Sequence, residues 1–289
     1  MTPSPRNEVP QFAVLGHPVA HSRSPWIHAE FARLTGIPLD YGRRDGHEAG
    51  PAAWRHLLIQ ARRDGLRGCN VTVPYKFDAL ASSHSETPRA RRAGAANTLT
   101  FTDDGKIEAD NTDGVGLVWD ITVNAGVALV GQRVLLIGAG GAASGVLGPL
   151  LEQQPAGLVV VNRTLERARA LVASHADLAG STRLSACAPA DVGEAYDVVI
   201  NSSSSSLAGV VGAPVPARVL RPGGLALDMM YGPAARSFLD WACAGGAMAR
   251  DGLGMLVGQA AESFAVWHGV RPPAAQVLAT LRELVDRPS

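Results

Sequence analysis

The sequence has few cysteines and no excess of charge of either sign. Cys69, Cys187 and Cys243 are widely spaced and form no C-x-x-C pair, which argues against a disulfide framework and against a zinc site. Lys+Arg and Asp+Glu number 26 each, and the arginines are scattered among acids. A nucleic-acid partner would normally require a basic excess or stripe. These absences favour a reducing cytoplasm, a small-molecule partner and no metal.

Long hydrophobic runs are also lacking. The uncharged stretch at 134–151 has about the length of a membrane span, but it contains five glycines and a proline, so a strand, a glycine turn and a helix explain it better. The N-terminal residues MTPSPRNEVPQ have no apolar segment of the kind that signal peptides carry. We therefore expect a cytoplasmic protein without a membrane partner, either a monomer or a homodimer.

The arrangement of apolar segments predicts an α/β protein. A chain of 289 residues suggests two domains, because domains commonly have about 100 to 200 residues. Short apolar runs alternate with segments of helix length, which is typical of β-α-β units and a parallel sheet. In the first half we predict strands at 11–15 and 68–73, helices at 25–34 and 52–63, and a hairpin formed by 99–102 and 106–108. In the second half we predict strands at 133–137, 158–161, 198–200 and 225–228, helices at 142–152, 165–174 and 235–244, and closing helices at 252–267 and 273–285.

A glycine turn follows the predicted strand at 133–137. The segment from Gly138 to Ala143 matches G-x-G-x-x-A between a strand and a helix, the context that a dinucleotide-binding fold requires. Gly138 permits the tight turn, Gly140 lets the backbone approach a pyrophosphate, and Ala143 allows the helix to pack closely on the strand. The free N–H groups of the helix N-terminus favour the phosphates. A glycine-rich loop that serves only packing is the alternative.

The next predicted strand ends in residues that favour NADP over NAD. It runs into Asn162-Arg163-Thr164, where an NAD-selective site usually places an acid for the ribose 2′-hydroxyl. Arg163 and Arg167 can instead donate paired hydrogen bonds to a 2′-phosphate. The alternative is that both arginines only solvate the start of a helix in an arginine-rich chain.

Lys76 stands out because lysine is rare in this chain. Only Lys76 and Lys106 among the 26 basic residues are lysines, and Lys106 follows Asp-Asp-Gly in a predicted turn. Lys76 lies just beyond a strand that ends at a proline, and an amine, unlike a guanidinium, can release a proton near neutral pH. Asp113 lies at the start of an apolar helix, where an N-cap is the simpler interpretation. Ser24, which precedes Pro25, is equally explained as an N-cap.

Seven motifs in order resemble the shikimate dehydrogenase family over nearly the whole chain. They are HSRSPWIH at 21–28, GCNVTVPYK at 68–76, GAANT at 94–98, DNTDGVG at 110–116, LLIGAGGAASGV at 135–146, VNRT at 161–164 and DGLGMLVGQAA at 251–261. The resemblance implies an N-terminal α/β substrate domain (1–113), a Rossmann-type doubly wound NADP domain with a parallel sheet (114–251), and C-terminal helices (252–289) that return to the first domain.

The resemblance also implies roles for individual residues. Lys76 and Asp113 correspond to the family's catalytic pair. The implied substrate-binding residues are Ser22, Ser24, Asn70, Thr72, Asn97, Tyr231 and Gln259. The implied cofactor-binding residues are Gly138, Ala139, Gly140, Gly141, Ala142, Asn162, Arg163, Thr164, Arg167, Met229 and Gly252.

Two segments depart from the family pattern. His17 precedes Pro18 where the family usually has Asn, and Ser202 to Ser206 replace a more varied Thr/Ser segment that normally closes with Gly. The serine run lies beside the expected nicotinamide side, which puts the geometry of the cofactor loop in question. His17 is interpreted as a tolerated polar residue at the rim.

The resemblance implies reversible hydride transfer between NADP and carbon 3 of a carbocyclic acid, interconverting 3-dehydroshikimate and shikimate in aromatic amino-acid (chorismate) biosynthesis. A quinate- or aminoshikimate-preferring relative is the alternative within the enzyme class. A nucleotide-sensing protein that kept the fold without turnover is the alternative outside it. The pKa of Lys76 is not determined by the sequence, because desolvation lowers a lysine pKa and a nearby carboxylate raises it.

Overall fold

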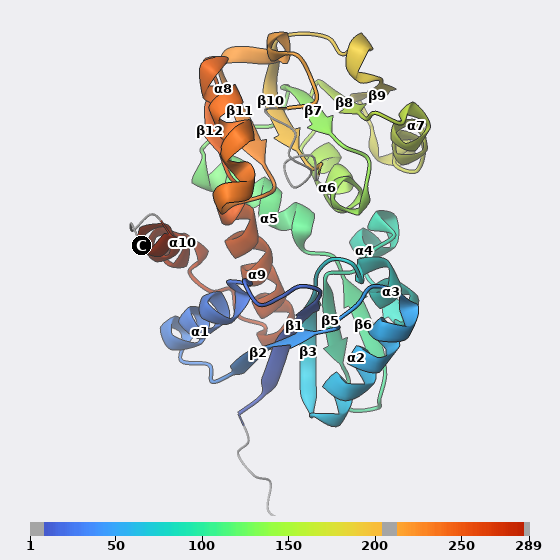
Figure 1. The fold of residues 1–289 in the computed structure, drawn as a ribbon, viewed down its shortest axis with the longest axis vertical. Helices are drawn as coiled ribbons and strands as arrows, with labels where there is room; N and C mark the ends of the chain where they lie inside the picture. The colour runs from blue at the N-terminus through green and yellow to red at the C-terminus, as the bar shows by residue number, and fades with distance from the viewer. Residues whose placement is uncertain (1–8, 204–212, 286–289) are drawn as a thin grey trace, which may run out of the picture.

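Two six-stranded sheets, each flanked by helices, form the two halves of the molecule (Figure 1). This computed structural model describes residues 9–203 and 213–285. The N-terminal half contains β1 (Gln11–Gly16), β2 (Asp40–Asp45), β3 (Leu66–Val71), β4 (Ser85–Glu86), β5 (Thr98–Phe101) and β6 (Ile107–Asp110), with α1 (Ser24–Thr35), α2 (Pro51–Arg63), α3 (Lys76–Ala81) and α4 (Pro88–Ala93). Its strand order is β2-β1-β3-β5-β6-β4, and the sheet is mixed, because β5 is antiparallel to both β3 and β6.

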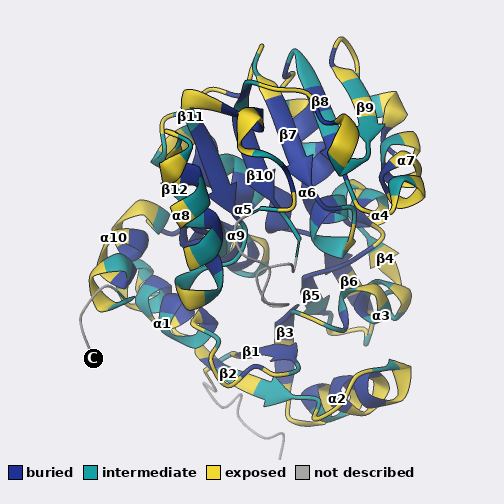
Figure 2. Cartoon of the chain, turned by 45° about the horizontal axis from the view of Figure 1, so that its top comes forward, coloured by how far each residue is buried: buried dark blue, intermediate teal, exposed yellow. Residues whose placement is uncertain are grey.

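The second sheet is entirely parallel, with the order β12-β11-β10-β7-β8-β9. It consists of β7 (Arg133–Ile137), β8 (Gly157–Val161), β9 (Arg183–Cys187), β10 (Tyr196–Asn201), β11 (Leu220–Asp228) and β12 (Met248–Arg250), with α6 (Gly141–Glu152), α7 (Leu165–Ala173) and α8 (Arg236–Ala244). Figure 2 shows the central strands β7 and β10 almost wholly buried. The strand order reverses between β7 and β10, and ligands of such sheets bind at that switch point, beyond the carboxyl ends of the strands.

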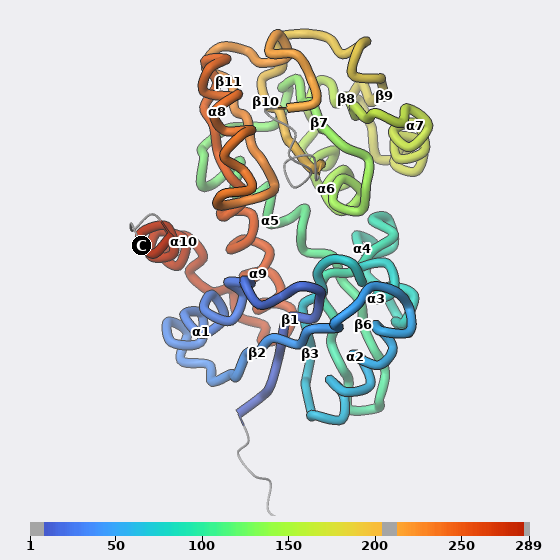
Figure 3. Tube along the Cα trace, viewed as in Figure 1, coloured from blue at the N-terminus to red at the C-terminus, as the bar shows by residue number. Residues whose placement is uncertain are grey.

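The chain crosses between the two halves through α5 (Asp113–Trp119) and returns through α9 (Leu253–His268) (Figure 3). The two helices pack closely because glycines face the contact. A Cβ added at Gly116 would lie 2.4 Å from the Gln259 nitrogen, and one at Gly258 would lie 2.9 Å from the Gly116 Cα. Beyond the crossing, α9 and α10 (Ala274–Val285) share an apolar cluster with α1. The C-terminal helices therefore return to the first domain, as expected.

Several predicted elements need correction. Strands β2, β4, β9 and β12 were not predicted, and all four are edge strands. Edge strands face solvent more than central strands and so show no continuous apolar run. Ser24 is not an N-cap, since it is the first residue of α1 and no side-chain cap precedes it. The apolar helix expected to follow Asp113 ends as α5 at Trp119 and continues as a π-helical turn, Asp120–Asn124.

The predicted domain boundaries fall at the starts of α5 and α9 and stay a prediction. Residues 204–206 of the serine run lie outside the described residues. Among residues 9–203 and 213–285, no helix has both the length and the apolar character needed to span a membrane.

Candidate active site

The structure brings Lys76 and Asp113 into direct contact. Each is the first residue of a short helix, α3 and α5 respectively. Lys76 Nζ donates a hydrogen bond to Asp113 Oδ2 over 2.6 Å. The lysine side chain is 22% exposed and the aspartate 8%. The ammonium can therefore be reached by a small molecule, while the carboxylate behind it is largely shielded.

Asn97 holds the second oxygen of Asp113. Its Nδ2 lies 2.9 Å from Asp113 Oδ1 and 3.2 Å from Gln259 Oε1, which belongs to α9. Its Oδ1 accepts the backbone N–H of Thr112 at 2.8 Å. Because both oxygens of Asp113 have a donor and Asn97 is tied to the backbone, the orientation of the carboxylate is fixed. Four residues predicted from the sequence thus form one contiguous group: Lys76, Asp113, Asn97 and Gln259.

Behind this group lies a buried layer in which Asn70 was predicted, while Tyr41, Thr98 and Ser263 were not. Asn70 accepts a hydrogen bond from the Tyr41 hydroxyl at 2.7 Å and lies 2.9 Å from Ser263 Oγ. Thr98 Oγ1 lies 2.8 Å from the same serine oxygen. The signal for Ser263 was present in the sequence, because it follows Gln259 by four residues and so occupies the same face of the helix.

The remaining predicted substrate residues lie near the start of α1, at the end of β3 and after β11. Ser22 Oγ lies 3.2 Å from Ser24 Oγ. Tyr231 packs against the apolar cluster that α1 and α9 share; burial raises the pKa of its phenol, and the nearby Arg23 acts in the opposite direction. Thr72 follows β3, with its methyl group close to Gly16. Within the described residues, 9–203 and 213–285, no hydrogen bond joins Ser22, Ser24 or Tyr231 to Lys76 or Asp113.

The glycine turn has the geometry that a dinucleotide phosphate requires. Gly138 has a φ of +107°, which a residue with a side chain rarely adopts. A Cβ at Gly140 would meet nothing within 4 Å, and no side chain caps the N-terminus of α6. Open space and free N–H groups therefore coincide at one helix start, which fits a pyrophosphate. Ala139, Gly141 and Ala142 complete this turn.

The glycine turn adjoins the lysine–aspartate pair. A Cβ at Gly145, one helical turn into α6, would lie 3.5 Å from Asp113 Oδ2. One at Gly141 would lie 3.0 Å from the ring of Phe77, the neighbour of Lys76. Ser144 also donates a hydrogen bond to the Ala93 carbonyl in α4 at 2.6 Å. The candidate cofactor site and the candidate catalytic pair are therefore adjacent.

The other predicted cofactor residues follow the carboxyl ends of β8, β11 and β12, with Arg167 in the first turn of α7 and Gly252 just before α9. Asn162 Nδ2 donates to the Thr164 carbonyl at 2.8 Å, which shapes the turn before α7. Arg163 and Arg167 are exposed, and neither forms an ion pair within the part of the chain that the structure describes, so both guanidinium groups are available to a phosphate. Met229 and Gly252 lie in close contact: a Cβ added at Gly252 would lie only 2.3 Å from the Met229 carbonyl oxygen.

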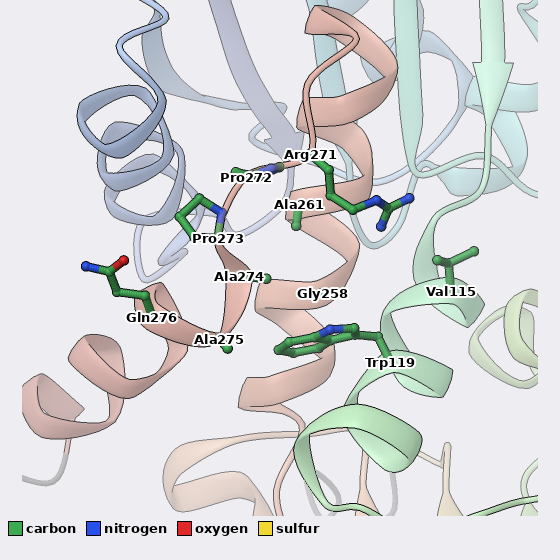
Figure 4. A pocket seen from close by; sticks show the side chains of 10 residues that line it. All are labelled: Val115, Trp119, Gly258, Ala261, Arg271, Pro272, Pro273, Ala274, Ala275 and Gln276. Carbon is green, nitrogen blue, oxygen red and sulfur yellow. The ribbon is translucent and has the colours of Figure 1, made fainter.

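A cavity of about 420 Å³ lies elsewhere, between α5, α9 and the start of α10 (Figure 4). Its walls are mostly apolar and include Trp119, Pro272 and Pro273. The Arg271 guanidinium at this cavity pairs with Glu262 at 2.7 Å. No predicted site residue lines it, so the candidate active site is a separate place. Among the described residues, no three His, Cys, Asp or Glu side chains gather in a way that could hold a metal ion.

Fold and site together define a two-domain, dinucleotide-dependent oxidoreductase, because a phosphate-binding turn at a parallel-sheet switch point adjoins a lysine able to exchange a proton. Comparison with known families identifies it further. Residues 14–99 match the shikimate dehydrogenase substrate binding domain, residues 122–215 match shikimate / quinate 5-dehydrogenase, and residues 252–282 match the shikimate 5′-dehydrogenase C-terminal domain.

Individual relatives cover nearly the whole chain. A shikimate dehydrogenase (NADP(+)) from Methylibium petroleiphilum is 59% identical over 281 residues, covering 96% of this chain and 95% of its own. The structure of an Ael1 enzyme from Pseudomonas putida superposes with a TM-score of 0.84 at 40% identity, covering 94% of this chain and 98% of its own. Shikimate 5-dehydrogenase from Thermus thermophilus in complex with NADP(H) and shikimate gives a TM-score of 0.80 at 34% identity, covering 95% and 99%.

The chain therefore belongs to the shikimate dehydrogenase family. Four expectations from the sequence are confirmed: the family, the α/β fold with a Rossmann-type domain, the oxidoreductase class and NADP as cofactor. The roles of the individual site residues stay predictions.

Proposed function

We propose that this chain interconverts 3-dehydroshikimate and shikimate, with Lys76 as the proton donor and acceptor and Asp113 as its partner. When bound, NADP supplies the hydride chemistry. The observation that carries the proposal is the 2.6 Å contact between Lys76 and Asp113 beside the glycine turn. This placement puts a proton-exchanging group next to the site for a redox cofactor.

Lys76 gives a proton to the substrate oxygen on reduction and takes it back on oxidation. An alkoxide that develops at the reacting carbon needs a donor within hydrogen-bond reach, and the partly exposed ammonium can provide it. Asp113 and Asn97 limit the positions that the amine can occupy. Positioning of this kind contributes to rate because the reacting groups are already oriented when substrate arrives.

Neutral side chains bind the rest of the substrate in this proposal. Ser22 and Ser24 at the start of α1, together with Tyr231 after β11, hold the carboxylate. Asn70, Thr72, Asn97 and Gln259 hold the ring hydroxyls. A site built on fixed hydrogen-bonding groups discriminates by hydroxyl pattern, since a substrate that lacks a partner leaves a buried polar group unsatisfied.

The glycine turn, the start of α7 and the segments that follow β8, β11 and β12 bind NADP in this proposal. Gly138, Ala139, Gly140, Gly141 and Ala142 hold the pyrophosphate. Asn162, Arg163, Thr164 and Arg167 surround the adenosine ribose and its 2′-phosphate. Met229 and Gly252 contact the nicotinamide end. We place the activity in the cytoplasm and in chorismate biosynthesis, in a monomer or homodimer.

The experiment that tests the proposal is a steady-state assay that crosses shikimate and quinate with NADP and NAD. The expected result is the largest kcat/KM for shikimate with NADP. Shikimate and quinate differ by one ring substituent, and such a difference changes selectivity by about 1 to 3 kcal/mol. The preference for shikimate over quinate is therefore expected to be measurable rather than absolute. A quinate preference of about tenfold or more would favour a quinate dehydrogenase, and binding of NADP without turnover of any acid would favour a nucleotide sensor.

A further inference from the structure

Two buried polar residues at the switch point of the parallel sheet take no part in the function proposed above. Asn201 is the last residue of β10 and Asp228 the last residue of β11. They are register partners, both are 0% exposed, and Asn201 Nδ2 donates to Asp228 Oδ2 over 3.0 Å. Burying a carboxylate is costly unless it is fully hydrogen-bonded, so this pair requires an explanation.

Each residue of the pair holds a loop of the cofactor site. Asp228 Oδ1 accepts the backbone N–H of Met230 at 2.9 Å, which fixes the loop that contains Met229. Asn201 Oδ1 accepts both the backbone N–H and the hydroxyl of Ser203, at 3.1 Å and 2.7 Å. The hydrogen bond between Asn201 and Asp228 therefore ties the loop after β10 to the loop after β11.

Ser202 extends this connection to the glycine turn. Its backbone N–H and its hydroxyl both donate to the carbonyl of Ile137, the last residue of β7, at 2.8 Å and 2.7 Å. A Cβ at Gly138 would lie 2.8 Å from the Ser202 hydroxyl oxygen. The first serine of the unusual serine run thus closes against the glycine turn rather than projecting into the cofactor site.

We infer that Asn201 and Asp228 are positioning residues for NADP, which set the loops after β10 and β11 against the glycine turn. The inference rests on the proposed NADP-dependent function. Burial raises the pKa of Asp228 to about 6, which is still below neutrality, so at pH 7 the carboxylate is ionised and can accept both hydrogen bonds. The donor and acceptor pattern then admits only one arrangement of the two side chains.

That pattern makes an exchange experiment possible. Asp228→Asn leaves one carbonyl oxygen for two donors, the Asn201 N–H₂ and the Met230 N–H, so either orientation of the new amide sets its own N–H₂ against a donor. Asn201→Asp places two carboxylates together. Each single variant therefore loses one hydrogen bond of this network and sets two like groups against each other. In the double variant N201D/D228N, the amide at 228 donates to the carboxylate at 201, so the hydrogen bond between the two positions is restored with its direction reversed. The pair still holds one carboxylate. The carboxylate at 201 can accept from Ser203, and the amide oxygen at 228 can accept from the Met230 N–H.

The measurement is the dissociation constant of NADP by titration calorimetry, with the melting temperature recorded in parallel. We expect about a tenfold or larger loss of affinity in each single variant, because loops that move to relieve the unpaired buried group must return to position when NADP binds, and that return costs about as much as the unpaired group. In the double variant we expect recovery to within about threefold of wild type. Tyr41→Phe breaks a buried hydrogen bond in the other domain and is expected to leave NADP affinity unchanged.

Wild-type NADP affinity in both single variants would overturn the inference, as would a folded double variant no better than the weaker single variant. If the single variants do not fold, the double variant decides alone, since it retains every bond: NADP affinity near that of wild type supports the inference and its loss refutes it. Direct binding separates this test from the proposed function. A chain that binds NADP with the expected variant pattern but turns over no acid contradicts only the catalytic proposal, and a wild-type chain that binds no NADP contradicts both.

Discussion

Lys76 Nζ and Asp113 Oδ2 lie 2.6 Å apart although 37 positions separate the two residues in the sequence. Strand pairing produces this contact. Asn70 in β3 is the register partner of Thr98 in β5, and Thr98 is in turn the partner of Asp110 in β6. The segments that leave β3 and β6 therefore begin side by side, and α3 and α5 start with Lys76 and Asp113 facing each other.

Replacing Lys76 by arginine separates charge from proton transfer. Lys76→Arg keeps the positive charge, but a guanidinium cannot release its proton near neutral pH and has a wider planar head. General acid-base catalysis is worth about 10²- to 10⁴-fold, so kcat should fall by about that factor while the NADP dissociation constant stays nearly unchanged. The measurement is kcat, KM and cofactor affinity for the variant beside wild type.

Lys106 provides the matched control, because it is the only other lysine in the sequence and pairs with Asp104 on the surface at 2.6 Å. Lys106→Arg should leave kcat unchanged. If Lys76→Arg retains more than about a third of the wild-type rate in a chemistry-limited assay, Lys76 is a binding residue and not the acid and base.

Arg163→Ala should weaken binding of NADP and barely affect NAD. Losing a charge-assisted hydrogen bond to the 2′-phosphate is expected to cost about 1.5 to 3 kcal/mol, and NAD has no phosphate at that position. The measurement is the dissociation constant of each cofactor. Arg169→Ala is the control, since Arg169 is also exposed on α7 but was assigned no role. Equal losses with both cofactors would show that Arg163 does not bind the 2′-phosphate.

Stability should depend on pH through His28. The ring is 0% exposed, and neither ring nitrogen has a hydrogen-bond partner within the described ranges. Burial lowers the pKa of His28 to about 3 from 6.5. Between these values the unfolded chain binds a proton that the folded chain excludes, so the free energy of unfolding falls as the pH falls through this range, by about 1.4 kcal/mol per pH unit.

His28→Phe should remove that dependence. The imidazole stacks on Tyr41 with centroids 4.1 Å apart and planes 5° from parallel, an arrangement that a phenyl ring can keep. From pH 7 to pH 5, wild type should lose about 2 kcal/mol more than the variant in denaturant unfolding. His56→Gln on the exposed face of α2 is the control and should behave like wild type. An unchanged pH slope in His28→Phe would mean that another group is responsible.

Local sequence was informative where the backbone itself makes the site. The turn from Gly138 to Ala143 needs a positive φ at Gly138 and open space for a phosphate at Gly140, and glycine provides both, so its location and its ligand class could be predicted. The absence of an acid at Asn162-Arg163-Thr164 indicated NADP in the same direct way. Lys76 could be singled out because lysine is rare in this chain, but its partner was recognised only through the family resemblance, since an Asp at a helix start is usually a cap.

The sequence by itself determined the alternation of strands and helices, the phosphate-binding turn and the residue types available for proton exchange, because these follow from periodicity and from the chemistry of single side chains. The tertiary structure decided which side chains meet. Edge strands β2, β4, β9 and β12 carry no continuous apolar run of their own and form because a neighbouring strand offers its backbone hydrogen-bonding groups. The contact of Asn201 with Asp228 depends on strand register, and that of Asn97 with Gln259 depends on how closely two glycines let α5 approach α9. Neither the register nor the distance between the helices can be predicted from a local sequence pattern.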